Sequence, residues 1–373
     1  VIMTDKTAKL GREPLFHITK RSEFSAWKSL LVYLAAILLG FVICGVIFAL
    51  VFGINPFSVY AGLFNGAFGT KRKFWIFLRD TMLLLGVGLA LIPAFKMKFW
   101  NLGGNGQITM GALAAVACMF YFGGKMPDAV VWLLMFVSSV VIAALWAVIP
   151  AIFKAFFNTN ESLFTLMMNY IAFALVNLAV SKWNPSGSQS LGEITKANFP
   201  AIGKDYMYLL IDIVIAIITC LIFIYLKYSK HGYELSVVGE SQNTARYIGI
   251  NVKKVIIRTM VLSGALCGIV GLLIAGGWHH TISTGTADNM GFTAIMVAWL
   301  ASFNPLIMIA TSAFIVFLDN GMSGVLSTFS ITSNAVPDLV IGIMYFCVIG
   351  CSFFIRYKVN FRKKINAEAK ESK

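Results

Sequence analysis

The chain has 373 residues, of which 58% are hydrophobic and only 12% are charged, and its mean hydropathy is +0.81. A soluble domain carries about twice this share of charged residues, so the composition excludes an ordinary soluble protein. The formal net charge of +14 does not indicate a nucleic-acid-binding protein, because the basic residues gather at the two ends and in one central loop. That distribution is typical of the cytoplasmic segments of a membrane protein.

Repeated apolar runs predict an all-α, polytopic membrane protein. Runs of about eighteen or more apolar residues can cross a bilayer as helices, and strand periodicity is absent. We expect about ten transmembrane helices with both termini in the cytoplasm, because this topology places most of the 30 Lys and Arg residues inside. The expected spans are residues 30–52, 81–94, 108–122, 130–153, 163–180, 206–226, 259–277, 292–301, 306–317 and 336–354.

The polar segments define the expected organisation. Residues 1–28 form a cytoplasmic N-terminal segment, in which residues 12–28 could make an amphipathic helix at the membrane interface. Residues 29–355 form a single transmembrane domain, and residues 356–373 form a basic cytoplasmic tail. The outer segments of this topology include the basic stretch 71–79 and the loops 181–205 and 323–334.

A glycine-rich polar octet at residues 100–107 stands between two short apolar segments. Its sequence is Trp-Asn-Leu-Gly-Gly-Asn-Gly-Gln. Backbone without helical hydrogen bonds is tolerated at membrane depth only where protein buries it or where it lines a cavity. We therefore expect a broken helix near the midplane of the bilayer, beside a solute pathway. A tight turn outside the membrane is the alternative interpretation.

Four amide side chains are candidate contacts for an uncharged solute. Asn101, Asn105 and Gln107 belong to the octet, and Asn169 lies in a later span. Amides both donate and accept hydrogen bonds, which suits a neutral polar solute that must bind weakly and leave. For Asn169 the alternative is a structural role, because small polar residues often join helices inside membranes.

A second polar segment, residues 227–258, is rich in Lys and Arg and lies inside in the expected topology. Within it, the sequence predicts a short helix over residues 241–247, which Ser241 caps and Gly249 ends. A short helix at the cytoplasmic face suits docking on another protein, and the alternative is a plain solvated loop. The chain contains no G-x-x-x-x-G-K-[ST] motif, so we expect no nucleotide-binding site of its own.

Four sequence motifs follow one another along the chain. Residues 101–112 read Asn-Leu-Gly-Gly-Asn-Gly-Gln-Ile-Thr-Met-Gly-Ala, and residues 160–172 read Asn-Glu-Ser-Leu-Phe-Thr-Leu-Met-Met-Asn-Tyr-Ile-Ala. Residues 232–250 form the third motif, and residues 263–271 read Ser-Gly-Ala-Leu-Cys-Gly-Ile-Val-Gly. This order resembles the permease subunits of ABC importers in the simple-sugar, branched-chain amino acid and nucleoside group. In particular it resembles the first of the two permeases in nucleoside importers that work with a basic membrane lipoprotein.

The resemblance implies a transport subunit that is not an enzyme and has no cofactor of its own, since a partner subunit binds ATP. It implies an ABC ATPase docked at residues 232–250, a second permease that completes a heterodimer, and an extracytoplasmic substrate-binding lipoprotein. The chain would then lie in the lipid bilayer of a bacterial cytoplasmic membrane, without nucleic acid, and import a nucleoside or similar small neutral solute. Within this segment the residues that we expect to couple to the ATPase are Gly232, Gly239, Asn243, Ala245, Arg246 and Gly249.

Several positions depart from the family pattern. Asn105 replaces the usual Glu of the first motif, which removes a charge from the expected pathway. Ser236 and Val237 stand in place of Arg and Ala, and Ser241 stands in place of Asn. These departures bear on the ATPase contact and on the substrate rather than on the fold.

Ion-coupled secondary transport of a small polar solute is the main alternative function. It usually places an Asp, Glu or His inside the helix bundle, whereas Asp80, Asp212, Asp288 and Asp319 fall near the ends of expected spans. A membrane-embedded enzyme would need a catalytic set such as H-E-x-x-H, and the sequence has none.

Glycine, cysteine and histidine residues in the spans point to packing rather than to chemistry. Gly264, Gly268 and Gly271 have the spacing of closely packed membrane helices. The six Cys residues lie in apolar runs without metal-ligand spacing. His279 and His280 alone are too few to hold a metal, so we expect a satisfied pair at the membrane interface.

Overall fold

The computed structural model describes residues 16–20, 26–184, 190–200, 208–333 and 335–361. Helices dominate these residues, and eight of the described helices are long and apolar enough to cross a membrane. Two shorter described helices, Met290–Leu300 and Ala335–Cys351, are also apolar. The chain is therefore a helical integral membrane protein, while the number of ten spans and the cytoplasmic termini stay predictions. The eight long segments are Leu31–Phe52, Lys71–Lys96, Gly104–Phe122, Asp128–Phe157, Glu161–Trp183, Leu209–Tyr228, Val252–His279 and Pro305–Phe329.

The chain divides into two compact units by its internal contacts, and the single transmembrane domain over residues 29–355 stays a prediction. The first unit joins the two ends of the chain, Val1–Val59 and Asp338–Lys373, and the second comprises Tyr60–Pro337. Contacts between segments that are far apart in sequence create the first unit, and no local pattern announces such contacts.

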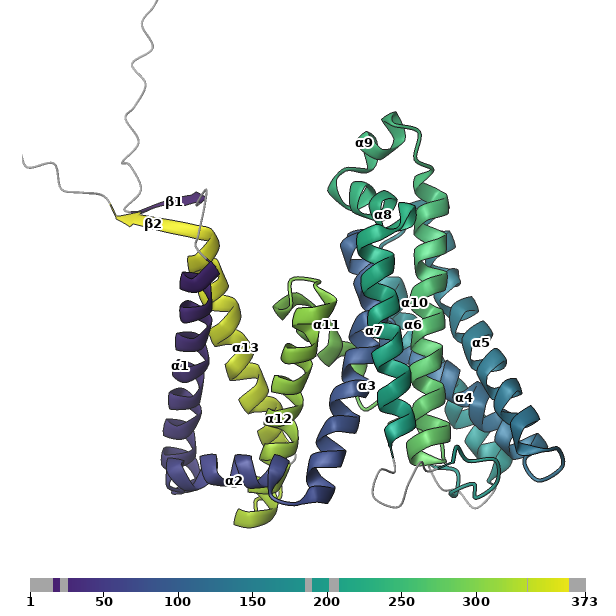
Figure 1. Cartoon of the computed structure of the whole chain (residues 1–373), viewed down its shortest axis with the longest axis horizontal. Coiled ribbons are helices and arrows are strands. Elements are labelled where there is room, and N and C mark those ends of the chain that lie inside the picture. Colours follow the sequence, from purple (N-terminus) through teal and green to yellow (C-terminus); the bar gives the residue numbers. More distant parts are fainter. Residues whose placement is uncertain (1–15, 21–25, 185–189, 201–207, 334, 362–373) are drawn as a thin grey trace, which may run out of the picture. The chain divides into compact units, whose positions relative to one another are not determined.

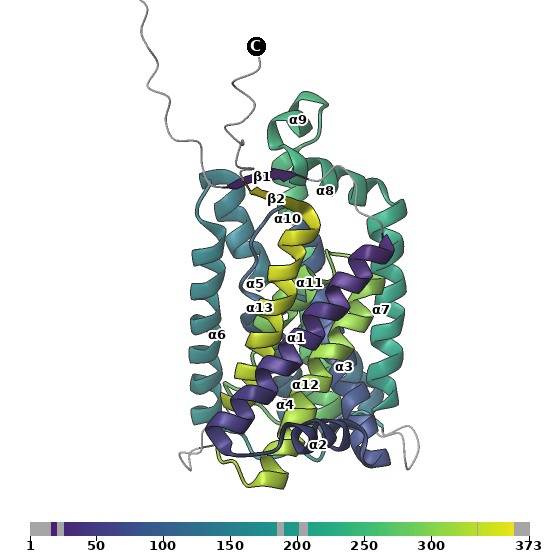
Figure 2. The same cartoon turned by 90° about the vertical axis from the view of Figure 1, so that its left-hand side faces the viewer.

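In the first unit, helix α1 (Ala26–Phe52) lies beside helix α13 (Ala335–Arg356), as Figures 1 and 2 show. Gly40 permits this approach, because a side chain at that position would overlap Met344. The first and last helices therefore pack through a small residue, as membrane helices commonly do.

The same unit contains a short antiparallel ribbon. Strand β1 (Phe16–Lys20) pairs with strand β2 (Tyr357–Phe361), with Phe16 opposite Phe361. The interfacial helix expected over residues 12–28 is therefore wrong at β1, and the fold is not purely helical. The sequence Phe-His-Ile-Thr-Lys is rich in strand-favouring residues, and β2 supplies its backbone partners.

The second unit holds the remaining helices. In chain order they are α2 (Pro56–Phe68, which belongs to this unit from Tyr60 on), α3 (Lys71–Lys96), α4 (Gly104–Phe122), α5 (Asp128–Phe157), α6 (Glu161–Trp183), α7 (Leu209–Tyr228), α8 (Lys230–Glu240), α9 (Gln242–Tyr247), α10 (Val252–Ile274), the π-helix η1 (Ala275–His279), α11 (Met290–Leu300) and α12 (Pro305–Phe329). Helix α10 is central, because it packs against α3, α4 and α5.

Glycines bring α10 close to its neighbours. A side chain at Gly268 would overlap the backbone of Ser139 in α5, and a Cβ at Gly111 of α4 would lie 2.7 Å from the Cα of Gly268. A side chain at Gly271 would overlap the carbonyl of Ile108. The prediction of close helix packing by small residues of α10 is confirmed.

Helices α3 and α12 extend about ten residues beyond their expected spans. Helix α3 begins at Lys71, because Thr70 caps it by accepting a hydrogen bond from the Lys73 amide at 3.2 Å. The basic stretch 71–79 is therefore helical rather than a loop. Helix α12 continues to Phe329, so residues 323–329 are helical as well and only the rest of the expected loop lies beyond it.

Candidate functional site

An irregular backbone segment, residues 97–103, joins α3 to α4. Helix α4 begins at Gly104, so the second half of the octet is helical and the interruption lies earlier than expected. Asn101 is fully buried, and its neighbours Met97 and Phe99 are buried as well. Protein thus encloses the part of this segment around Asn101, and burial by protein is one condition for irregular backbone at membrane depth. Its position relative to the midplane stays a prediction.

Asn101 organises the inside of this segment. Its Oδ1 accepts hydrogen bonds from the Gly103 amide at 3.0 Å and from Nε2 of Gln107 at 3.2 Å. Its Nδ2 donates to the hydroxyl of Ser263 of α10 at 3.3 Å and to Oε1 of Gln107 at 3.4 Å. The two octet amides therefore bind each other and anchor the segment on α10.

Helix α6 supplies the outer partners of the segment. Oδ1 of Asn169 accepts a hydrogen bond from the Gly106 amide at 2.8 Å, and its Nδ2 donates to the Leu102 carbonyl at 2.9 Å. The Leu102 amide in turn donates to Oγ1 of Thr165 at 3.1 Å. The first amides of a helix lack intrahelical partners, so Asn169 acts as a cap for α4 from a different helix.

Asn105 links α4 to a distant part of the chain. Its Oδ1 accepts a hydrogen bond from the Gly291 amide, at the start of α11, at 2.7 Å. Asn105 is only 1% exposed. An amide oxygen is sufficient for this bond, and burying a carboxylate here would cost more free energy than burying an amide. The hydrogen bond to Gly291 thus gives a structural reason for Asn at position 105, where the family pattern has Glu.

All four predicted amides are at most 2% exposed, and each has a protein partner. Their arrangement favours a structural role for Asn169, which is one of the two readings that the sequence leaves open. The structure brings the four residues together around the start of α4. Direct contact with a solute stays a prediction.

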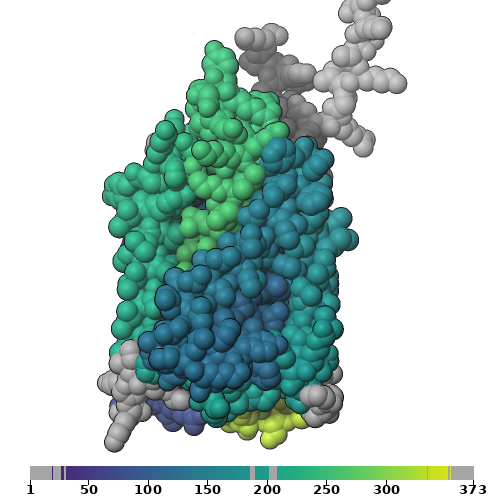
Figure 3. Space-filling view, turned by 90° about the vertical axis from the view of Figure 1, so that its right-hand side faces the viewer, coloured from purple at the N-terminus to yellow at the C-terminus, as the bar shows by residue number. Residues whose placement is uncertain are grey.

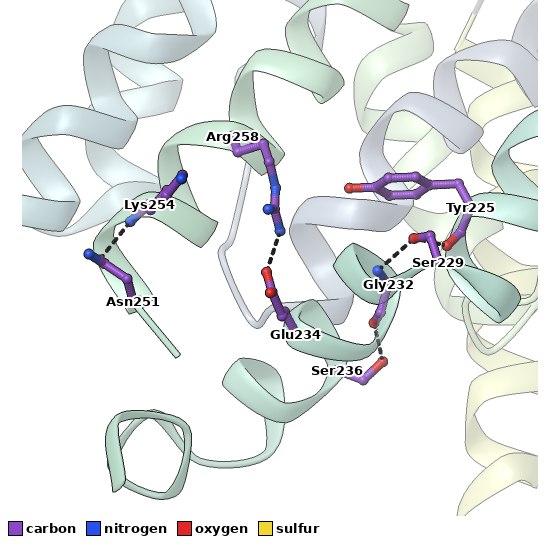
Figure 4. A network of polar contacts seen from close by, with 8 residues as sticks. All are labelled: Tyr225, Ser229, Gly232, Glu234, Ser236, Asn251, Lys254 and Arg258. Carbon is purple, nitrogen blue, oxygen red and sulfur yellow. Dashed lines mark hydrogen bonds and ion pairs between the residues drawn. The ribbon is translucent and has the colours of Figure 1, made fainter. Parts of the chain in front are cut away.

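Residues 227–258, which are called the coupling segment after the role expected of them, contain the two short helices α8 and α9 (Figures 1 and 4). Ser229 caps α8 by accepting a hydrogen bond from the Gly232 amide at 2.9 Å. The start of α8 requires glycine at position 232, because a Cβ there would lie only 2.6 Å from the Tyr225 carbonyl oxygen. The short helix expected over residues 241–247 is confirmed, with Ser241 as its cap.

Helix α9 has an inner and an outer side. Ala245 is fully buried and packs in a cluster with Leu235 of α8 and Val252 of α10. Asn243 and Arg246 are exposed. In Figure 3 this green segment stands clear of the blue and teal helices below it.

Tyr247 is 92% exposed at the end of α9, and our sequence reasoning missed it as a docking candidate. A large aromatic ring in a short polar helix is the signal that could have identified it. Gly249 follows with a φ of +86°, a conformation that favours glycine and ends the helix.

Helix α8 packs directly on the end of α3. A side chain at Gly239 would overlap the carbonyl of Lys96, and its Cβ would lie 3.3 Å from the Cα of Met97. On the other side, Arg258 of α10 forms an ion pair with Glu234 of α8 at 2.9 Å (Figure 4). The coupling segment is thus joined both to the irregular segment 97–103 and to α10.

A buried charged cluster lies elsewhere in the second unit, and the sequence did not predict it. Arg79 pairs with Asp80 at 2.7 Å, and its guanidinium lies over the rings of Tyr208, at 4.6 Å, and Trp278, at 3.7 Å. Asn320 donates to the second oxygen of Asp80 at 3.1 Å. The available signal was an Arg-Asp dipeptide between the apolar residues 74–78 and the apolar run that starts at Met82 of α3.

Asp212 lies near this cluster, but unlike Asp80 it has no hydrogen-bond partner among the described residues. It lies in the first turn of α7, as the expected span end predicts, yet it is only 7% exposed. Neither carboxylate oxygen has a hydrogen-bond partner among the described residues. An ionisable residue of this kind inside a membrane protein is a candidate functional group.

His279 stacks on Trp278, with ring centroids 3.8 Å apart. The described residues contain no group of three or more His, Cys, Asp or Glu side chains that could hold a metal ion.

Known proteins similar to this chain include the following three permeases. Guanosine ABC transporter permease protein NupP of Bacillus subtilis is 31% identical over 346 residues, covering 91% of this chain and 98% of that protein. Nucleoside ABC transporter permease protein NupB of Lactococcus lactis is 28% identical over 347 residues, covering 89% and 92%. Glucose ABC transporter permease protein TsgB13 of Haloferax volcanii is 24% identical over 324 residues, covering 82% and 83%. No solved structure matches the chain significantly.

Residues 72–349 match the family described as branched-chain amino acid transport system / permease component. This match covers both the octet and the coupling segment. The chain therefore belongs to the family of branched-chain amino acid transport system permease components.

Proposed function

We propose that this chain is the transmembrane permease subunit of an ABC importer that carries a nucleoside or a similar small neutral solute. Two of the relatives above are named for guanosine or nucleoside transport, which supports this class. The amide-rich surroundings of α4 agree with an uncharged solute, because Asn101, Asn105 and Gln107 bring no charge to the path.

The close contact between Gly239 of α8 and Lys96 of α3 is the observation on which the proposed mechanism rests. A separate ATPase, which alone binds ATP, docks on α8 and α9 from the cytoplasm of a bacterial cell. When it closes, it displaces α8, and the tight packing at Gly239 passes this displacement to residues 97–103 and so to α4. Close-packed elements transmit such shifts because they have few intermediate arrangements.

The assembly follows from the same proposal. The eight long apolar helices and the two shorter ones make the ten spans, with both termini in the cytoplasm. A second permease completes a heterodimer, as the motif at residues 160–172 suggests by resemblance, and an extracytoplasmic lipoprotein delivers the solute.

The test uses the assembled complex in proteoliposomes with Gly239→Val. We expect ATP hydrolysis to continue while uptake of labelled nucleoside falls at least tenfold, because the β-branched side chain separates α8 from α3. Gly342→Val is the matched control, since no atom lies within 4 Å of a Cβ at Gly342. Unchanged uptake in the Gly239 variant would contradict the proposed route.

A second substitution guards against misfolding at Gly239. Ala245→Glu places a charge in the buried side of α9 and should separate the ATPase from the permease during purification. An ATPase that still co-purifies and drives uptake would place the docking surface elsewhere.

Ion-coupled secondary transport is the second candidate, and it is favoured by Asp212, whose carboxylate has no hydrogen-bond partner among the described residues. The family match weighs against it. Uptake driven by a proton gradient without an ATPase, and abolished by Asp212→Asn, would establish this alternative in place of the first.

A further inference from the structure

A hollow of about 430 Å³ lies where the end of α3, the irregular segment, α8 and α11 meet. Its volume is within the range of small-molecule sites, roughly 300 to 1,000 Å³. The wall contains aromatic side chains from α3, from the irregular segment and from α11 with the turn after it, together with polar side chains from α8. Because residues 97–103 and α8 border it, the hollow lies at the junction through which coupling passes.

Four aromatic rings build one wall. Trp100 and Trp299 are stacked, with centroids 5.4 Å apart and planes 20° from parallel. Phe95 and Phe303 form a second near-parallel pair at 6.1 Å, and edge contacts connect the two pairs. The rings fix one another, so the wall is a rigid platform for a flat ligand.

The two indoles keep part of their surface open. Trp100 is 41% exposed and Trp299 is 46% exposed, whereas Phe95 behind them is 5% exposed. A ring that only filled space would be covered as Phe95 is. An aromatic belt at the membrane surface would also be exposed, but α8 forms the opposite wall of this hollow.

The charged side chains around the hollow leave only a small positive excess. Lys96 and Lys98 bring two positive charges, and Glu240 brings one negative charge. The carboxyl end of α3, where both lysines lie, adds a partial negative charge of about one half. This excess is smaller than the charge of about −1.5 to −2 on a phosphate monoester, which favours an uncharged ligand over a phosphorylated one. Together with Ser236, these side chains offer both donors and acceptors to the edge of a ring.

We propose that this hollow binds the planar aromatic base of the transported solute as it leaves on the cytoplasmic side. The proposal rests on the proposed function for the class of solute and for the side of the membrane. The base stacks on Trp100 and Trp299, while Lys98 and Glu240 contact its polar edge. A bound base touches both α8 and residues 97–103, so release of the solute is coupled to the movement of α8.

The binding test uses the full chain in detergent with tritiated guanosine and uridine, measured by scintillation proximity. Base–aromatic stacking predicts that Trp100→Leu and Trp299→Leu each weaken binding about tenfold. Trp27→Leu is the matched control, since Trp27 is exposed in the first unit. Unlabelled ribose, which has no aromatic ring, should not compete.

Glu240→Gln tests the charge argument at an exposed position that should not affect folding. We expect guanosine 5′-monophosphate to bind the natural chain more weakly than guanosine does. In the Glu240→Gln variant, the affinity for the monophosphate should increase at least threefold. A monophosphate that binds the natural chain tighter than guanosine would overturn the proposal in favour of an anion site. Equal binding by all Trp variants, or competition by ribose, would overturn it as well.

Uptake by the assembled complex separates this proposal from the function on which it rests. If the complex imports nucleosides while the two Trp variants bind and transport normally, the exit site is wrong and the permease function stands. If the complex imports no nucleoside while an added sugar is imported, the proposed solute class is wrong, and binding of guanosine to the chain would then also be absent.

Discussion

Replacing Asn169 by Ala should loosen the start of α4. The substitution leaves the Gly106 amide and the Leu102 carbonyl without their partners, which lie at 2.8 and 2.9 Å in the natural chain. Asn169 is 2% exposed, so water does not readily replace the lost bonds. The change acts on a helix cap and on an irregular backbone segment at the same time.

The expected loss of stability can be bounded from both directions. Side-chain hydrogen bonds in a membrane protein average about 0.6 kcal/mol each, which gives about 1 kcal/mol for the two bonds. A buried group left without a partner costs about 1 to 3 kcal/mol, which gives up to about 6 kcal/mol for two such groups. We expect a value between these limits, because neither backbone group can turn to another helix.

The assay is thermal unfolding of the purified chain in detergent, followed by near-ultraviolet circular dichroism. Asn177→Ala is the matched control, because Asn177 lies two turns further along α6 and is exposed. It should change the free energy of unfolding by less than about 0.5 kcal/mol. An Asn169 variant as stable as this control would refute the capping argument.

Three further predictions concern other parts of the second unit. Gly268→Leu should destabilise the chain by about 3 kcal/mol or more in the same assay, because the side chain meets the backbone of α5, whereas Gly350→Leu, with no atom within 4 Å of its Cβ, should change little. Arg79→Met should cost about 3 to 5 kcal/mol, since it leaves Asp80 as an uncompensated, largely buried charge; a smaller effect would mean that Asp80 reaches water. Burial lowers the pKa of His280 below its usual value of about 6.5, so its contribution to stability is complete above that pH and is lost as the pH falls below it. His280→Asn should therefore reduce the difference in unfolding temperature between pH 7 and pH 5. An unchanged difference would mean that another group causes the pH dependence.

Local chemistry allowed parts of this structure to be predicted from the sequence. Helix α9 was predictable because Ser241 and Gly249, which start and end it, stand within a few residues of each other. The start of α3 was not, because the charges at 71–79 resemble a loop, while the single cap at Thr70 decides the matter. Charge alone is a weak guide where helices extend beyond the apolar run.

Long-range partners could not be predicted in this way. The amide of Asn101 was identified by type, but its partner Ser263 lies far along the chain. Gly291, the partner of Asn105, is 186 residues away. A sequence pattern shows that an amide is out of place in a membrane helix, but it does not show whether a solute or a backbone group satisfies it.

The amide network has a consequence for how the protein can move. Hydrogen bonds from this one junction reach α6 through Asn169, α10 through Ser263 and α11 through Gly291. Pulling any of these helices away from α4 would strand polar groups in an apolar interior. The helices around the start of α4 should therefore travel through a transport cycle as one rigid body, and its hinges should lie at the far ends of those helices.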